Sequence, residues 1–312
     1  MGEFIATIFG IKSRLLVYFE NCIQFPCQKG MIFFKLLSLL PLSLLYILSD
    51  GVYLLGYHVL KYRQKVILTN IQEAFPEKTA QEHHRIAKAF FRNLTDSFAE
   101  IIKAYSMSKE EFNRRVQIIH SEIVTSHIEK GEVLIGMTGH FFNWEWHLLQ
   151  MMANIDNRVD VVYTKVSNAF FEKLMMIIRT RFGGQMVEKD SFQRDYLRKR
   201  NQPRMIVLAA DQRPGNRDIR YWREFMGRDT AFFEGAEKLA KRFNHPVLYA
   251  HVSKPKRGHY VFRYELMDSP PFSDKLEHSI TDQFIELLEN NIREQPEIYL
   301  WSHNRWKWKK AE

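Results

Sequence analysis

A histidine is followed by a carboxylate in the segment Gly139-His140-Phe141-Phe142-Asn143-Trp144-Glu145, directly after an apolar run at 133–138 that predicts a strand. On one continuous helix, residues five apart point about 140° away from each other, because each residue turns by about 100°. His140 and Glu145 can therefore meet only if His140 lies in the turn before a helix and Glu145 lies one turn inside it.

In such a pair the imidazole is the candidate general base, and the carboxylate is the group that supports it. The carboxylate would hold the imidazole in one tautomer and stabilise the imidazolium that forms when the base takes a proton. No Gly-x-Ser-x-Gly sequence, the usual setting of a serine nucleophile, occurs in the chain. The proton would then come from a substrate hydroxyl or amine, which indicates acyl transfer. The same spacing also arises by chance in a chain with 12 histidines, so its neighbours have to decide.

The expected setting of His140 is also chemically sensible. Sites in open α/β sheets gather at the carboxyl ends of the strands, which is where the turn before the helix would place this residue. The N-terminus of that helix would offer N–H groups that help to stabilise an oxyanion.

Further segments accompany the first along the chain. They are Arg179-Thr180-Arg181-Phe182-Gly183-Gly184, Leu208-Ala209-Ala210-Asp211-Gln212, Phe225-Met226-Gly227-Arg228 and Tyr299-Leu300-Trp301-Ser302-His303-Asn304-Arg305-Trp306-Lys307. Together with the His140 segment, and in this order, they resemble the bacterial lipid A biosynthesis acyltransferases, the family of late lauroyl and myristoyl transferases. The resemblance runs from about Leu36 to Lys307, nearly the whole chain.

The resemblance implies a mechanism. His140 would deprotonate a hydroxyl of a lipid A precursor, and the alkoxide would attack the thioester of acyl-acyl carrier protein directly, without an acyl-enzyme. Glu145 would orient His140. The family also implies that no cofactor is needed, and that the catalytic domain lies on the cytoplasmic side of the bacterial inner membrane, where acyl carrier protein is found.

The same segments supply candidates for substrate binding. Arg179 and Arg181 are two residues apart, so one would face the site and the other the solvent, and a planar guanidinium suits a phosphate of the acceptor. Asp211 would either hydrogen-bond near the site or cap the turn at Pro214-Gly215. Arg305 belongs to an aromatic and basic C-terminal cluster that would seat an anionic headgroup, anchor at the membrane interface, or serve the structure alone.

Two other interpretations stay open. Phe232-Phe233-Glu234-Gly235 resembles the Phe-Pro-Glu-Gly motif of glycerolipid acyltransferases, in which the glutamate helps to bind a phosphate-bearing acceptor. The first interpretation is an acyltransferase that uses the same histidine–carboxylate pair on another lipid, such as a lysophospholipid or an amino-acid-containing lipid. The other interpretation is a non-enzymatic basic membrane or nucleic-acid-binding protein, although no nucleic-acid motif is present and the aromatic residues follow core periodicity. No metal is expected, since His147, seven residues after His140, forms no metal-ligand spacing.

Composition agrees with an enzyme of the membrane surface. The 312 residues include 45 Lys and Arg against 36 Asp and Glu, and the formal net charge is +9. This surplus favours anionic partners such as phospholipid headgroups, phosphorylated glycolipids and an acidic carrier protein. Cys22 and Cys27 are interpreted as free thiols of a reducing compartment.

Residues 31–60 are predicted to be a membrane anchor, since Lys35 and Asp50 are their only formal charges. Residues 32–48 have about the minimum length of a bilayer span, with Pro41 as a tolerable kink in its middle. A helix buried in the core or lying in the interface is the alternative. Basic residues on both sides leave the orientation open. Residues 1–30 would be an extension of unknown role, with Met31 as a plausible alternative start.

Residues 61–312 are predicted to form one catalytic domain. Strand-like and helical segments alternate, which favours an α/β fold with a mostly parallel central sheet flanked by helices. A turn at 254–258 predicts that the last two strands form a hairpin. The expected strands are 133–138, 159–164, 205–210, 246–252 and 260–266, and the expected helices are 80–105, 143–153, 170–181, 235–243 and 281–291.

Overall fold

The computed structural model describes residues 27–155, 158–215, 218–219 and 221–310. Its centre is a seven-stranded sheet in the order β1-β9-β8-β2-β5-β3-β4. Strands β8, β2, β5, β3 and β4 are parallel to one another, while β9 runs antiparallel to β8 and β1 runs parallel to β9. The bounds are β1 (Val116–Ile119), β2 (Val133–Thr138), β3 (Val159–Tyr163), β4 (Gln185–Glu188), β5 (Arg204–Ala209), β8 (Val247–Lys256) and β9 (His259–Asp268).

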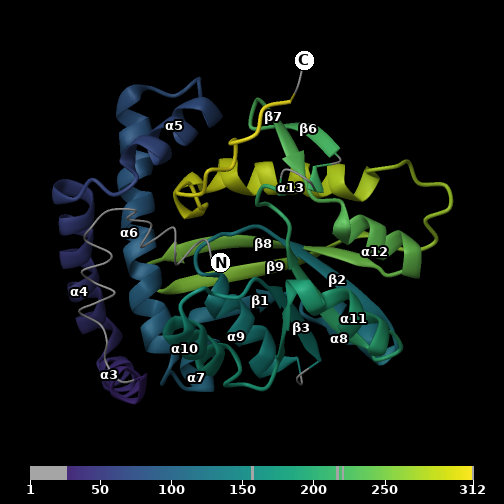
Figure 1. Ribbon diagram of the computed structural model, residues 1–312, viewed down its shortest axis with the longest axis horizontal. Coiled ribbons are helices and arrows are strands. Elements are labelled where there is room, and N and C mark those ends of the chain that lie inside the picture. The colour runs from purple at the N-terminus through teal and green to yellow at the C-terminus, as the bar shows by residue number, and fades with distance from the viewer. Residues whose placement is uncertain (1–26, 156–157, 216–217, 220, 311–312) are drawn as a thin grey trace.

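The predicted α/β architecture is confirmed. Strand β2 lies between β5 and β8, and all six of its residues are buried, as expected for a central parallel strand covered on both faces. Helices α12 (Gly235–Phe243) and α13 (Ser279–Glu294) lie on one side of the sheet, and α9 (Trp144–Asn154) and α10 (Ala169–Arg179) lie on the other (Figure 1).

The predicted hairpin is also confirmed. Strands β8 and β9 pair antiparallel, and the chain reverses at Arg257-Gly258, where Gly258 has φ +71°. The pattern did not predict the short strands β1 and β4, or the separate antiparallel pair β6 (Tyr221–Phe225) and β7 (Arg228–Phe232). The remaining elements are α5 (Gln64–Ala74), α7 (Lys109–Arg115), α8 (Glu122–Glu129), η2 (Lys189–Ser191), α11 (Phe192–Arg198) and η4 (Pro296–Ile298).

A layer of N-terminal helices stands beside the sheet (Figure 1). Helix α6 (Ala80–Ala104) begins at a capping box in which Thr79 and Glu82 bond reciprocally to each other's backbone N–H. Helix α4 (Leu42–Leu54) packs along it and continues into a π-helical turn, η1 (Leu55–Val59). Helix α3 (Cys27–Leu39) precedes α4 and also contacts α6.

The predicted span at 32–48 is wrong in its bounds, because the helix breaks at Leu40–Pro41. Pro41 is extended, with φ −53° and ψ 142°. The carbonyls freed by the break are bound from α6 and its end: Lys103 Nζ donates to the carbonyls of Ser38 (3.2 Å) and Leu40 (3.1 Å). Among the described residues, the one helical stretch long and apolar enough to cross a membrane is Leu42–Val59.

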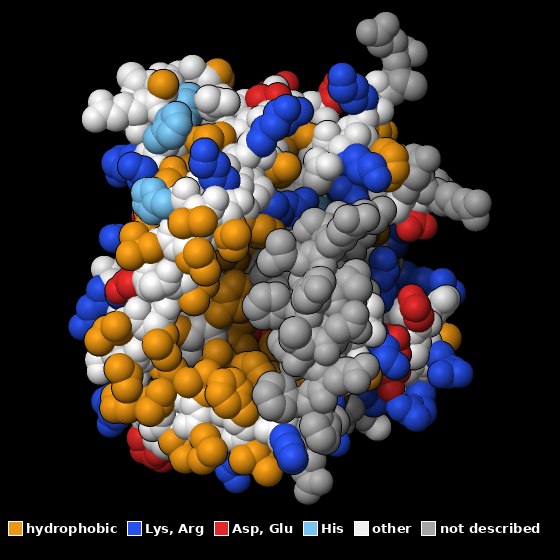
Figure 2. All heavy atoms as spheres, turned by 60° about the vertical axis from the view of Figure 1, so that its left-hand side comes forward, with side chains coloured by type: hydrophobic (Ala, Val, Ile, Leu, Met, Phe, Trp, Pro, Cys, Tyr) orange, Lys and Arg blue, Asp and Glu red, His pale blue; other side chains and the backbone are white. Residues whose placement is uncertain are grey.

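Helix α4 has two different faces. Toward the domain it buries Leu42, Leu45 and Tyr53 and also forms polar contacts. Tyr46 donates to Glu100 (2.8 Å), Ser49 donates to Asp96 (2.8 Å), and Arg257 pairs with Asp50. Away from the domain it is apolar, and Figure 2 shows hydrophobic side chains gathered over this side of the molecule. The exposed apolar face, as we call it below, comprises Ile32, Phe33, Leu36, Leu39, Leu44, Ile47, Leu48, Val52, Leu54, Leu55, Val59 and Leu60.

Candidate active site

His140 lies where the sequence predicts it, between the end of β2 at Thr138 and the start of α9 at Trp144. The C-terminal segment holds this loop from one side. The Phe142 N–H donates to the carbonyl of Ile298 (2.9 Å), and Phe141 forms an isolated antiparallel bridge with Tyr299. The loop is therefore fixed between β2 and a segment more than 150 residues later in the chain.

The start of α9 is fixed by Asn143, its N-cap. The Asn143 Oδ1 accepts from the N–H groups of Glu145 (3.1 Å) and Trp146 (3.2 Å), and its Nδ2 donates to Glu100 (2.9 Å). The cap therefore uses two of the N–H groups at the N-terminus of this helix, and these two are not open to an oxyanion. Glu100 is fully buried and also accepts from the Tyr260 hydroxyl, and its burial raises its pKa.

The partner of His140 is Asp211. The two side chains meet at 2.5 Å between Nδ1 and Oδ1, and the backbone N–H of His140 donates to Oδ2 (2.9 Å). Asp211 follows β5, the neighbour of β2 in the sheet, so the two parallel strands deliver both residues to the same edge. Of the two functions predicted for Asp211, hydrogen bonding near the site is the one that fits this position.

The position of the hydrogen on the His140 ring follows from the charge of Asp211. Burial disfavours the charged form of Asp211, but His140 and its two hydrogen bonds outweigh burial, so the pKa of Asp211 is lowered. An ionised carboxylate can only accept, so the hydrogen of His140 is assigned to Nδ1. The lone pair of Nε2 is then the basic position of this imidazole.

Glu145 does not contact His140 through the expected hydrogen bond. It lies in the first turn of α9, as predicted, but its side chain is directed toward α10. There Arg179 Nε donates to Oε2 (2.8 Å) and Nη2 donates to Oε1 (2.6 Å). Both groups are buried, and α9 and α10 pack against each other, so the ion pair joins the two helices.

A tryptophan connects Glu145 with the catalytic histidine candidate. Trp144 Nε1 donates to Glu145 Oε1 (3.1 Å). The Trp144 ring also meets the His140 ring edge-on, with centroids 5.4 Å apart and an interplanar angle of 72°. Glu145 thus reaches His140 indirectly, by holding the ring against which the imidazole packs.

The two arginines named as phosphate ligands both have partners in the protein. Arg179 is fully buried with Glu145, which corrects the expectation that one of the pair faces the site and the other the solvent. Arg181 donates from Nη1 to the carbonyl of Ala104 at the end of α6 and lies over the Phe182 ring. Through these contacts the arginines join α10 to α9 and to α6.

Arg305 is buried, and the charge of Asp211 acts on it. Its Nη2 donates to the carbonyl of Ala231 (2.7 Å), and its guanidinium lies 4.5 Å from the centre of the Phe232 ring. Burial lowers its pKa to about 10. Burial also lowers the pKa of His303, two residues earlier, to about 3, and the charges that act on His303 include those of Asp211 and His140.

Sequence reasoning missed two neighbours of the site. Trp144 and Arg213 carry no motif of their own, although each lies close in sequence to a residue that was named, Glu145 or Asp211. Arg213 Nη1 donates to the carbonyl of Asn304 (2.7 Å), which joins the loop after β5 to the C-terminal segment.

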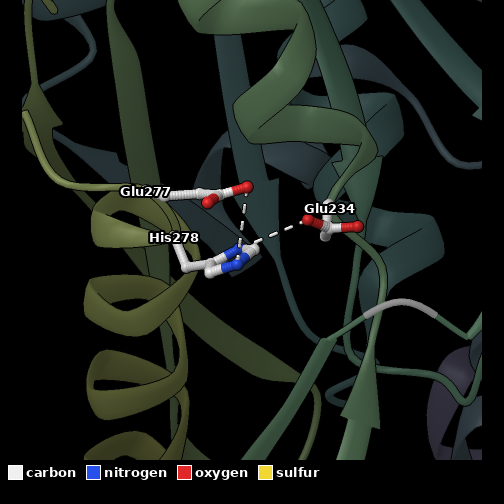
Figure 3. Close-up of side chains that lie close together, drawn as sticks. All are labelled: Glu234, Glu277 and His278. Carbon is white, nitrogen blue, oxygen red and sulfur yellow. Dashed lines mark ion pairs between the residues drawn. The ribbon is translucent and has the colours of Figure 1, made fainter.

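Glu234, the candidate of the glycerolipid interpretation, lies at the start of α12. It forms ion pairs with Lys238 (2.8 Å) and with His278 (3.3 Å), and His278 lies 3.8 Å from Glu277 (Figure 3). The ligand atoms of Glu234, Glu277 and His278 lie within 4.8 Å of one another, a spacing compatible with a metal ion. The side chain of Glu277 is 85% exposed, and the contacts act as ion pairs between the starts of α12 and α13.

The sequence model of a family described as bacterial lipid A biosynthesis acyltransferase matches residues 19–308. The chain belongs to this family. The match begins before Leu36, where the resemblance was expected to start, so residues 19–35 also follow the family pattern. Residues 1–26 lie outside the described part of the structure.

Curated relatives agree with this family. A lipid A biosynthesis acyltransferase of Haemophilus influenzae is 23% identical over 275 residues, 87% of this chain and 84% of that protein. The lipid A biosynthesis lauroyltransferase of Escherichia coli is 23% identical over 273 residues, 86% of this chain and 87% of that protein. A solved 1-acyl-sn-glycerophosphate acyltransferase from Thermotoga maritima has a TM-score of 0.39 and 12% identity, covering 85% of this chain and 98% of that chain. The protein is an acyltransferase of lipid A biosynthesis.

Proposed function

We propose that this protein transfers a fatty acyl group from acyl-acyl carrier protein to a hydroxyl of a lipid A precursor, with His140 as general base and Asp211 as the residue that orients it. Family membership supports the acyl transfer. The observation that carries the assignment of the base is the hydrogen bond from His140 Nδ1 to a buried aspartate at the carboxyl edge of two adjacent parallel strands.

The chemistry follows from the protonation of the pair. Nε2 of His140 takes the proton of the acceptor hydroxyl, and the oxygen forms a bond to the thioester carbon. When the tetrahedral intermediate collapses, the carbon–sulfur bond breaks and the thiolate of the carrier leaves with the proton that Nε2 returns. Asp211 stabilises the imidazolium between these steps, because it is ionised and bonded to Nδ1–H.

Glu145 has a different part in this proposal. Its charge is balanced by Arg179, and its contact with the base passes through the Trp144 ring. We assign it a positioning role in place of the orienting role that the spacing predicted.

We propose that the exposed apolar face orients the protein on the membrane. Because α4 is bonded to α6 along its inner side, the face would lie in the plane of the cytoplasmic leaflet of the inner membrane, in the manner of an interfacial helix.

Changing an outward residue of α4, Ile47→Lys, should weaken binding to vesicles with anionic lipids while the unfolding temperature stays unchanged. Leu276→Lys is the matched control, since Leu276 is also exposed but lies outside this face. Equal vesicle binding by both variants and the wild type would contradict this orientation.

The acceptor assignment is tested with purified protein, one acyl-carrier donor, and a panel of acceptors. The panel contains a lipid A precursor, a lysophospholipid and an amino-acid-containing lipid. Turnover of the glycolipid supports the proposal. Turnover of a lysophospholipid alone would move the protein to the glycerolipid interpretation and would make Glu234 the first residue to change.

A further inference from the structure

The C-terminal segment 298–308 lies against both loops that carry the His140–Asp211 pair. It binds the His140 loop through the carbonyl of Ile298. It binds the loop after β5 twice, because Arg213 donates to the carbonyl of Asn304 (2.7 Å) and Trp308 Nε1 donates to the carbonyl of Pro214 (3.0 Å). Residues of this segment are therefore held beside the reacting groups.

Three side chains of this segment, those of Ser302, His303 and Arg305, hold buried polar atoms without a partner among the described residues. Nε and Nη1 of Arg305 and Nε2 of His303 have no hydrogen-bond acceptor or donor among the described residues. Arg305 is only 3% exposed. Buried donors in folded proteins are nearly always paired, so two unpaired positions on one guanidinium point to a partner that binds from outside the chain.

The charges of the surroundings favour an anion as that partner. Neither Arg305 nor Arg213 forms an ion pair within the described ranges. Asp211, whose charge acts on Arg305, accepts from His140 with both of its oxygens. Arg305 stays charged at neutral pH, since its pKa is lowered only to about 10. Arg213 is half-buried and brings a second positive charge from the surface side.

We propose that Arg305, His303 and Arg213 form an anion-binding subsite beside His140, and that it holds a phosphate group of the acceptor lipid. The assignment to an acceptor rests on the proposed function. This subsite takes the place of Arg179 and Arg181 as the predicted phosphate ligands, because the donors of those two arginines are directed at Glu145 and Ala104. A phosphate carries its charge before the reaction begins and accepts several hydrogen bonds, which suits two arginines that together exceed the single charge of Asp211 and the unpaired N–H groups of Arg305.

The experiment compares a phosphorylated, acylated disaccharide with the same glycolipid after phosphatase treatment. Turnover and micelle binding are measured for wild type, Arg305→Gln, Arg213→Gln and, as a control, Arg242→Gln. Arg242 is an exposed residue near the end of α12 and has no part in the subsite. Arg305→Gln and Arg213→Gln should each lower kcat/KM for the phosphorylated acceptor by about 10- to 100-fold, mainly through KM, because charge-assisted bonds are lost. The dephosphorylated acceptor and the control should change little.

The outcomes distinguish a failure of the proposed subsite from a failure of the proposed function. Equal losses on both acceptors, carried by kcat, would overturn the phosphate assignment in favour of charge stabilisation at the reacting carbon. If wild type turns over neither glycolipid, the proposed function fails, and binding still decides the subsite: it stands if Arg213→Gln loses the preference for phosphorylated micelles. A site for free phosphate would instead show competition by inorganic phosphate without any preference between the micelles, and would overturn the proposal. Because Arg213 is half-buried, its variant decides the matter should Arg305→Gln fail to fold.

Discussion

Asp211 and Glu145 are two buried carboxylates near the His140 loop. They differ in how exposed the side chain of the partner is and in whether the partner keeps a basic atom that the carboxylate does not bind. The side chain of His140 keeps 12% of its surface exposed, and its Nε2 is directed away from Asp211. The side chain of Arg179 is 0% exposed, and its Nε and Nη2 both bind Glu145. The first pair keeps a basic atom that the carboxylate does not bind, while the second joins two helices. A carboxylate close in sequence to a histidine need not be its partner.

The largest expected effect is on His140. His140→Ala should lower the rate of acyl transfer by about 10²–10⁴-fold, the usual contribution of general-base catalysis. The assay is single-turnover transfer from acyl-acyl carrier protein to the lipid A precursor, with circular dichroism as the control for folding. A folded variant that keeps more than about a tenth of the wild-type rate would show that His140 is not the base.

Asp211→Asn should be the next most damaging change to activity, with a loss of about a hundredfold or more, because an amide no longer stabilises the imidazolium or enforces its tautomer. The protein should remain folded, since the amide oxygen can still accept from the His140 N–H. The expected signature is a fall in kcat with little change in KM. Near-normal kcat in Asp211→Asn would show that Asp211 does not support the base.

Glu145→Gln should act in the opposite way, on stability more than on rate. Removing one partner of a buried ion pair costs about 3–5 kcal/mol of unfolding free energy, because the other charge is left buried without its counterion. The rate should fall by less than about tenfold, through a looser Trp144 ring. Urea unfolding and kcat measure the two effects. Replacing both partners with apolar residues, Glu145→Leu with Arg179→Met, should recover most of the stability.

A smaller effect concerns pH. The pKa of Asp211 is lowered from its ordinary value of 3.8, so its interactions stabilise the fold above that pH and are lost as the pH falls through the lowered value. The difference in melting temperature between wild type and Asp211→Asn should therefore be present at about pH 5 and shrink below about pH 4, as the carboxylate takes up a proton. A difference that grows on acidification would contradict the sign of this linkage.

The sequence predicted the strand–turn–helix around His140, the five longer strands and the closing hairpin, because buried apolar runs and turn residues are local signals. It did not predict that Asp211 is the partner of His140, since these two residues are 71 positions apart and are brought together only by the pairing of β2 with β5. Nor did it predict the break at Pro41 as the end of a helix. The bonds from Lys103 that satisfy the freed carbonyls come from a distant helix.

The most direct test is the protonation of the His140 ring, measured by ¹⁵N NMR of side-chain nitrogens and assigned by the signals missing in His140→Ala. When the imidazole is neutral, wild type and Glu145→Gln should both carry the hydrogen on Nδ1, because Asp211 accepts it there. Asp211→Asn should shift the hydrogen toward Nε2, since the amide can present an N–H to Nδ1. A shift in Glu145→Gln with no change in Asp211→Asn would make Glu145 the orienting carboxylate and contradict the account.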